Sequence, residues 1–257
     1  MRGICAAVIG LSLAAITTAG AAEPLTKPFA YDNVHIRVAD PQKAAEWYVK
    51  ALGAKPSEAP TPQTAQVSFG AQAITITKGD STASSMGTLI DHFGLSFSDL
   101  DAAVKQAQAA GAKVTAQPAM SPGIFRYAYI EDPWGVRIEM VEDKQKLGFH
   151  HVHLRVKDPT ATLNWFEQNI GGERTKLYGK LDGMRYNGVW LFAMASGDTA
   201  PAPPTAADAR AVLDALAATG YDRAVSIEMK AVADDGMAGL AVSVGHLHAA
   251  ARDGGYL

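Results

Sequence analysis

Cysteine is almost missing from this chain of 257 residues, because Cys5 is the only one. It lies in an N-terminal segment that we expect to be removed from the mature protein. Without Cys5 the chain has no thiol nucleophile and cannot form an internal disulfide. Cysteine catalysis is therefore excluded for the mature chain, and its stability has to come from its core.

The chain also lacks an excess of charge of either sign. Lys and Arg number 23 and Asp and Glu number 26, so the formal net charge is −3. This balance gives no electrostatic reason to expect binding to nucleic acid or to an anionic membrane. The sequence also shows no phosphate-binding loop, no nucleophile–His–Asp set and no cysteine-based zinc motif. We therefore expect the partner to be a small molecule.

Long apolar runs are scarce, and the one at the N-terminus is too short for a permanent membrane anchor. Arg2 precedes an apolar run at residues 4–16, and small residues at 19–21 follow it. This order predicts a secretory signal peptide at residues 1–21, with an N-terminal helix of the fold as the alternative. The mature protein would then be periplasmic or secreted, with no membrane contact after cleavage.

One sequence pattern recurs along the chain. Residues 33–41 read NVHIRVADP, and residues 151–159, which lie 118 positions later, read HVHLRVKDP. The same offset relates Trp47 to Trp165 and Gly53 to Gly171. A fainter copy at residues 91–99 lies halfway, at an offset of 59. The chain therefore contains three copies of a module of about 59 residues, a period typical of repeated structural units.

Each copy is predicted to hold a strand, a helix and then further strands. Apolar and polar residues alternate over 34–38, as in a strand with one apolar face. Asp40 and Pro41 suit the start of a helix, and Gly53 suits its end. Strands at 66–69 and 73–77 follow, with a shorter strand near 55–58. The first copy therefore reads as a βαβββ module.

The other two copies repeat this order. The second has predicted strands at 92–97, 113–116, 126–130 and 136–141, and a helix at 100–110; the third has predicted strands at 151–156, 175–177, 183–186 and 189–194, and a helix at 160–169. We predict an α+β fold of paired βαβββ modules. A complete two-module domain would span residues 30–143, and a third, unpaired module residues 148–198.

The pattern ends where a fourth copy is due. Residues 199–205 are a Pro-rich linker, and residues 206–257 predict a helix, a strand near 224–229 and a second helix. The stretch 220–230 resembles the last βα unit of a xylose-isomerase-like sugar isomerase/epimerase barrel. Such a barrel needs eight βα units. We therefore interpret the tail as a structural appendage.

The modules resemble the vicinal-oxygen-chelate superfamily, which includes glyoxalase I, extradiol dioxygenases, fosfomycin-resistance thiol transferases and bleomycin-resistance proteins. The likeness covers residues 30–198. It rests on strands that open with His and lead into Asp-Pro, and on residues 132–139, which match the closing motif Asp-Pro-x-Gly-x-x-x-Glu. In this superfamily two modules pair around a cleft that holds a divalent metal. The resemblance therefore implies a metal site built from the first and last strands of two modules.

His92 and Glu139 fall at two of the ligand positions that the resemblance implies, and Glu139 is also the catalytic candidate. The opening position of the first module is Asn33, a poor ligand, and the position that is acidic in glyoxalases is Thr75. Both departures argue against glyoxalase activity. His35 lies two residues from Asn33 on the same strand face and would complete a two-His-one-carboxylate set with His92 and Glu139. Fe, Mn, Zn or Ni would suit such a set.

The third copy carries a second partial site. His151 falls at the ligand position, with His153 beside it on the same strand face and His150 before it. Partners from a fourth module are missing. Because an uncovered module would expose half a core, we expect either a homodimer through the third module or cover by the tail.

Three functions fit these observations. The first is a metal-dependent lyase or dioxygenase that acts on a small oxygenated or aromatic compound, with Asn33, Tyr127, Tyr129 and Trp134 as substrate-binding candidates. The second is a metal-free binding protein of the bleomycin-resistance type. The third is a degenerate tandem enzyme whose second cleft was lost with the fourth module. Metal content separates the first function from the other two.

Overall fold

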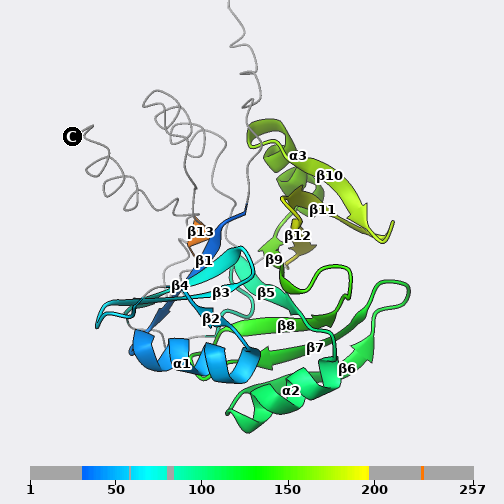
Figure 1. Ribbon diagram of the computed structural model, residues 1–257. Helices are drawn as coiled ribbons and strands as arrows, with labels where there is room; N and C mark the ends of the chain where they lie inside the picture. Colours follow the sequence, from blue (N-terminus) through cyan, green and yellow to red (C-terminus); the bar gives the residue numbers. More distant parts are fainter. Residues whose placement is uncertain (1–30, 58, 80–83, 197–226, 229–257) are drawn as a thin grey trace, which may run out of the picture.

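The computed structural model describes residues 31–57, 59–79, 84–196 and 227–228 (Figure 1). The predicted signal peptide, the Pro-rich linker and both predicted tail helices lie outside these residues. The likeness of the tail to a sugar isomerase barrel stays a prediction. Within the described part of the chain, no helix combines the length and the apolar character needed to cross a membrane.

The first module has the predicted βαβββ order. It consists of β1 (Asn33–Val38), α1 (Pro41–Leu52), β2 (Lys55–Pro56), β3 (Thr64–Phe69) and β4 (Gln72–Lys78). The side chain of Asp40 accepts the backbone N–H of Lys43 and so caps the start of α1. Gly53 ends the helix with a φ of 74°, a left-handed conformation that glycine adopts at little cost.

The second and third modules repeat this order, and the predicted fold class is confirmed. The second consists of β5 (Ile90–Ser96), α2 (Leu100–Ala109), β6 (Lys113–Met120), β7 (Arg126–Glu131) and β8 (Arg137–Glu142). The third consists of β9 (Gly148–Val156), α3 (Pro159–Asn169), β10 (Glu173–Leu177), β11 (Leu181–Tyr186) and β12 (Val189–Ala195). Asp99 and Asp158 cap α2 and α3 as Asp40 caps α1. The repeat in sequence is thus a repeat in structure.

The pairing of the modules differs from the prediction. The second and third modules share one eight-stranded sheet, in the order β10-β11-β12-β9-β5-β8-β7-β6, in which β5 and β9 lie antiparallel at the centre. The first module forms a separate sheet, β13-β1-β4-β3-β2. The expectation of an unpaired third module is therefore wrong. Only residues 143–147 link β8 to β9, and elements joined by so short a connection usually lie side by side.

The first module packs against the second through its helix. Figure 1 shows α1 and α2 side by side below the sheets, and Nε1 of Trp47 donates to the carbonyl of Ala110 at 2.8 Å. Apolar side chains of both sheets form one core. At the edge of the first sheet, β13 (Ile227–Glu228) pairs parallel with β1. The tail strand therefore covers the first module, whereas the sequence suggested cover of the third.

A buried hydrogen bond joins the first two modules. The hydroxyl of Tyr48 donates to Oδ2 of Asp132 at 2.7 Å, and Oδ1 of Asp132 accepts the N–H groups of Trp134 and Val136. Burial raises the pKa of Asp132 to about 6, although these hydrogen bonds act to lower it. The Tyr48 hydroxyl is therefore an important partner of a carboxylate that is costly to ionise in this position.

We expect Tyr48→Phe to lower the free energy of unfolding by about 1–3 kcal/mol at pH 7.5, because the buried carboxylate loses a donor. The folded-state pKa of Asp132 lies above the usual value for an exposed Asp, so ionisation costs stability as pH rises toward 6 and beyond. The loss should therefore be smaller at pH 4.5 than at pH 7.5. Urea denaturation at both pH values measures this, and equal stability of the two proteins at pH 7.5 would contradict it.

Candidate metal centre

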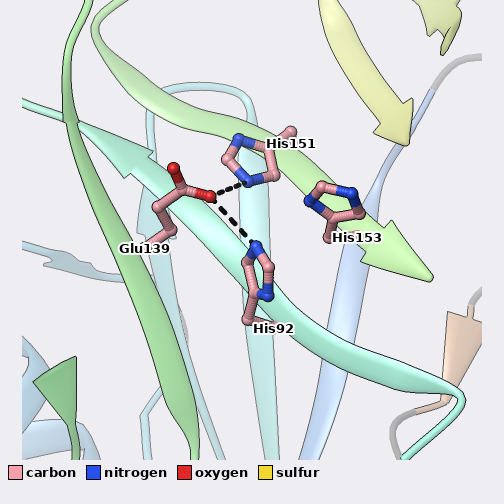
Figure 2. Close-up of side chains that lie close together, drawn as sticks. All are labelled: His92, Glu139, His151 and His153. Carbon is pink, nitrogen blue, oxygen red and sulfur yellow. Dashed lines mark hydrogen bonds and ion pairs between the residues drawn. The ribbon is translucent and has the colours of Figure 1, made fainter. Parts of the chain in front are cut away.

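Three histidines and one glutamate converge at the centre of the eight-stranded sheet (Figure 2). His92 comes from β5, Glu139 from β8, and His151 and His153 from β9. Their donor atoms all lie within 4.8 Å of one another. Oε2 of Glu139 lies 3.0 Å from Nε2 of His92 and 3.1 Å from Nε2 of His151. Imidazole and carboxylate groups in such a cluster are the ligands that a divalent transition metal prefers.

The register of three neighbouring strands brings these side chains together. His92 pairs with His153 across the antiparallel β5 and β9, and Gly94 pairs with His151. Gly94 is also the partner of Glu139 across the parallel β5 and β8. A Cβ atom on Gly94 would lie 2.1 Å from Cε1 of His151. The missing side chain at position 94 therefore makes room for the His151 ring next to Glu139.

The buried carboxylate of Asp91 contacts the ring nitrogen of His92 that faces away from Glu139. Oδ1 of Asp91 lies 2.7 Å from Nδ1 of His92, and Oδ2 of Asp91 accepts Nε–H of Arg155 at 2.9 Å. Arg137 also donates to Asp91. Burial acts to raise the pKa of Asp91, but the hydrogen bonds from His92 and from the N–H of Gly87, with the charges of His92 and Arg137, outweigh it and hold the pKa well below its usual value. An ionised Asp91 fixes the proton of His92 on Nδ1, which leaves Nε2 directed at Glu139.

His151 is held by a longer chain of the same kind. Its Nδ1 lies 2.8 Å from Nδ1 of His150, whose Nε2 lies 3.3 Å from Oδ2 of Asp143. When Nε2–H of His150 donates to Asp143, Nδ1 of His150 carries no proton. It can then accept a hydrogen bond from Nδ1–H of His151. This arrangement leaves a lone pair on Nε2 of His151, the atom that faces Glu139. Both inner histidines thus present Nε2 to the same carboxylate oxygen.

His153 adds a fourth donor without a partner. Its Nδ1 is buried and has no hydrogen-bond partner among the described residues. Burial, reinforced by the charges of His92 and His151, lowers the pKa of His153 to about 2, and burial lowers the pKa of His151 to about 4. Both rings are therefore neutral and can each offer a lone pair. An orphaned ring nitrogen beside two directed imidazoles and a carboxylate fits a divalent metal ion.

Four of the five predicted metal ligands meet in this cluster, and His35 does not. His35 lies on β1 of the other sheet, where its strand partner is Thr75. The expected set of His35, His92 and Glu139 is therefore corrected, and so is the separate site expected in the third module. Because β5 pairs with β9, the missing partners of His151 and His153 come from the second module.

The two carboxylates that orient the histidines, Asp91 and Asp143, were only partly predictable from the sequence. Asp91 directly precedes His92, and an acidic neighbour is a usable signal for a residue that orients a histidine. Asp143 carries no such signal, because its contact with His150 depends on the turn between β8 and β9.

A cavity of about 240 Å³ opens beside the cluster. Its wall is mostly apolar or aromatic and consists of Ser121, Ile124, Phe125, Tyr127, Tyr129, Glu139, His151, His153, Leu181 and Phe192. Tyr127 and Tyr129, which were predicted to bind substrate, line this cavity, although their role stays a prediction. Asn33 lies on β1, and Trp134 packs edge-on against Trp47 with ring centres 6.1 Å apart. Neither lines this cavity.

Metal affinity should rise with pH. Burial acts to lower the pKa of His92, but hydrogen bonds to Asp91 and Glu139 outweigh it and raise the pKa above its usual value. A bound metal needs the unprotonated Nε2, so binding would release this proton. We expect the Kd for Zn²⁺ to fall about tenfold per pH unit until His92 is deprotonated, and to level off above that pH. Titration from pH 5.5 to 8.5 against a competing chelator measures this, and a pH-independent Kd would contradict it.

Comparison with known proteins agrees with this architecture. Residues 30–140 match the model of the Glyoxalase/Bleomycin resistance protein/Dioxygenase superfamily. Glyoxalase I from Zea mays is 19% identical, with a TM-score of 0.51 over 65% of this chain and 66% of that chain. A variant of the same Zea mays protein is also 19% identical, with a TM-score of 0.54 over 66% of this chain and 68% of that chain. The search among curated proteins returned no match.

A TM-score of 0.54 shows a shared fold, and an identity of 19% carries no conclusion about activity. The matched segment includes β1 to β7 and most of β8, including His92 and Glu139. His151 and His153 lie beyond it and enter the site through the pairing of β9 with β5. Residues 30–140 thus match the glyoxalase/bleomycin resistance protein/dioxygenase superfamily, and the described chain has the fold of glyoxalase I.

Proposed function

We propose that this protein is a divalent-metal-dependent enzyme that acts on a small oxygenated or aromatic compound. The observation that carries the proposal is that Nε2 of His92 and Nε2 of His151 converge on one oxygen of Glu139. The other ring nitrogen of each histidine is hydrogen-bonded, that of His92 to Asp91 and that of His151 to His150. Histidines that bind a metal are regularly oriented in this way, by a hydrogen bond at the ring nitrogen that does not bind the ion. Fe, Mn, Zn or Ni would suit the four donors.

The charges of the site favour a substrate that carries an anionic or polarisable oxygen. Glu139 is the sole acidic residue on the wall of the described cavity. A divalent ion held by one carboxylate and three neutral imidazoles keeps a net positive charge. When bound, the ion would act as a Lewis acid on a substrate oxygen.

The wall of the cavity would bind the rest of such a compound. Phe125 and Phe192 offer apolar ring surface, and the two tyrosines add hydroxyl groups. With Glu139 engaged by two histidines, no second carboxylate on this wall is left to act as a separate base. This supports chemistry of the dioxygenase type over proton abstraction of the glyoxalase type.

Metal analysis of the purified chain without residues 1–21 tests the proposal. We expect about one equivalent of metal after reconstitution with Fe²⁺, Mn²⁺, Zn²⁺ or Ni²⁺. His92→Ala and His151→Ala should each abolish it, because both residues serve one site. His35→Gln is the matched control, since His35 is also a buried strand histidine, and it should keep the metal. Loss of metal in His35→Gln, or binding that survives both alanine variants, would refute this site.

A metal-free binding protein is the second candidate, favoured by the apolar character of the cavity wall. It predicts no metal in any form of the protein but an increase in Tm with a small aromatic acid. The third hypothesis, a degenerate tandem enzyme, predicts neither response.

Export and self-association remain proposals. Residues 1–21 support export, and detection of the chain without them in a periplasmic or culture fraction would test it. A homodimer is no longer needed to complete the third module, because β9 pairs with β5. Sedimentation of the purified protein tests whether a dimer forms for another reason.

A further inference from the structure

The turn between β10 and β11 is linked to the metal centre from outside the cavity. The hydroxyl of Tyr178 in this turn donates to Oδ1 of Asp143 at 2.8 Å. Oδ2 of the same carboxylate lies 3.3 Å from Nε2 of His150, and Nδ1 of His150 faces Nδ1 of His151 at 2.8 Å. A hydroxyl on a surface turn is thus joined to a metal-ligand candidate through two buried side chains.

The main chain of Asp143 is fixed, which leaves its carboxylate to be oriented by side-chain partners. Its N–H donates to Oγ of Ser96 at 3.0 Å, and Oγ of Ser96 donates to its carbonyl at 2.8 Å. The carboxylate is buried and also accepts the N–H of Gln145 through Oδ1. Tyr178 therefore shares Oδ1 with a backbone donor and leaves Oδ2 for His150.

The backbone of Tyr178 is consistent with a side chain that is held in place. Its φ is 51°, in the left-handed region that is unfavourable for a non-glycine residue. Tyr178 as a whole is 40% exposed. The tight hairpin turn accounts for this backbone, since Asn187 has a φ of 50° in the next hairpin, so it is the contact of the hydroxyl with the buried carboxylate that points to its role.

We propose that Tyr178 is a positioning residue of the metal centre, acting through Asp143 and His150 to keep Nε2 of His151 directed at the metal. The inference rests on the proposed metal site. With Tyr178 bound to Oδ1, Oδ2 of Asp143 accepts the Nε2 proton of His150, and Nδ1 of His150 accepts from His151. Without Tyr178 the carboxylate is free to turn, and this order of donors and acceptors is less well defined.

The same turn supplies a matched control. Nζ of Lys180 donates to the carbonyl of Pro122 at 2.8 Å, next to the loop whose Ser121, Ile124 and Phe125 line the cavity. Lys180 thus ties this turn to the cavity wall but does not contact Asp143. A variant of Lys180 loosens the turn without changing the donors around the carboxylate.

The test compares the Kd for Zn²⁺ of the full set of variants by competition with a chromogenic chelator. We expect Tyr178→Phe to raise the Kd about tenfold, the lower end of the loss seen when a residue that orients a metal ligand is changed. The Kd of Lys180→Met should stay within about twofold of that of the parent protein. Urea denaturation without metal should show that both variants remain folded. Asp143→Asn should weaken binding at least as much as Tyr178→Phe.

A double variant shows whether Tyr178 acts through Asp143. In the Asp143→Asn background, Tyr178→Phe should have almost no further effect on the Kd, because the partner through which it acts is already changed. Additive effects, an unchanged Kd in Tyr178→Phe, or equal weakening in Lys180→Met would overturn the inference. Failure of the parent protein to bind Zn²⁺ would instead refute the proposed function, and the inference with it.

Discussion

Glu139→Gln should abolish metal binding while the protein remains folded. The substitution keeps the size of the side chain, but it replaces one carboxylate oxygen with an NH2 donor and removes the one negative charge in the cluster of four donors. Loss of a partner behind a ligand typically weakens metal binding 10–100-fold, so loss of this ligand should weaken it by more than about 100-fold. The measurement is the Kd for Zn²⁺, with the unfolding midpoint of the metal-free protein taken alongside.

Glu142→Gln is the matched control for this change. Glu142 lies on the same strand, β8, but forms ion pairs with Arg126 and Lys144 away from the cluster. We expect its Kd to equal that of the parent protein, because partly exposed ion pairs contribute little. Metal binding that survives Glu139→Gln with a similar Kd would mean that the histidines alone hold the ion.

Gly94→Ala should disrupt the site through one added methyl group. The new Cβ would lie 2.1 Å from Cε1 and 2.2 Å from Nδ1 of His151, so the ring has to move. The ring would then lose its alignment with both Glu139 and His150. We expect the Kd for Zn²⁺ to rise more than about tenfold and the free energy of unfolding to fall by about 1–3 kcal/mol, as for an overpacked core.

Two further variants show whether the clash with His151 is the cause. Gly79→Ala adds the same methyl group where the nearest atom, Cδ of Arg37, is 3.4 Å away, and it should leave both quantities nearly unchanged. In a His151→Ala background the ring is absent, so Gly94→Ala should cost little further stability. An equal loss of stability with and without the ring would show that Gly94 is needed for another reason.

The sequence by itself determined the modules and their internal order. Local rules were sufficient for this, since Asp at the start of each helix caps it and alternating apolar residues define one buried face of each strand. The offset of 59 residues also identified His92 and His151 as equivalent positions. Together with the closing motif at 132–139, it was enough to name four of the residues that meet in the cluster.

Only the tertiary structure decided which modules pair, and therefore that these four residues form one site. The first strands of the three modules, β1, β5 and β9, have similar local patterns. By pattern alone, β5 could therefore pair with either β1 or β9. The short link between β8 and β9 and the burial of both β5 faces against the rest of the core select β9. That choice excludes His35, which shares a strand pattern with His153 but lies on the other sheet.

The partners behind the ligands depend on the same choice. Tyr178, Asp143 and His150 come from a turn, a loop and a strand that have no common period in the sequence. Their contact exists because the β10–β11 turn folds back on the end of β8 once the two modules share a sheet. A local pattern encodes which face of an element is buried, whereas the partner on that face is set by packing of the whole chain.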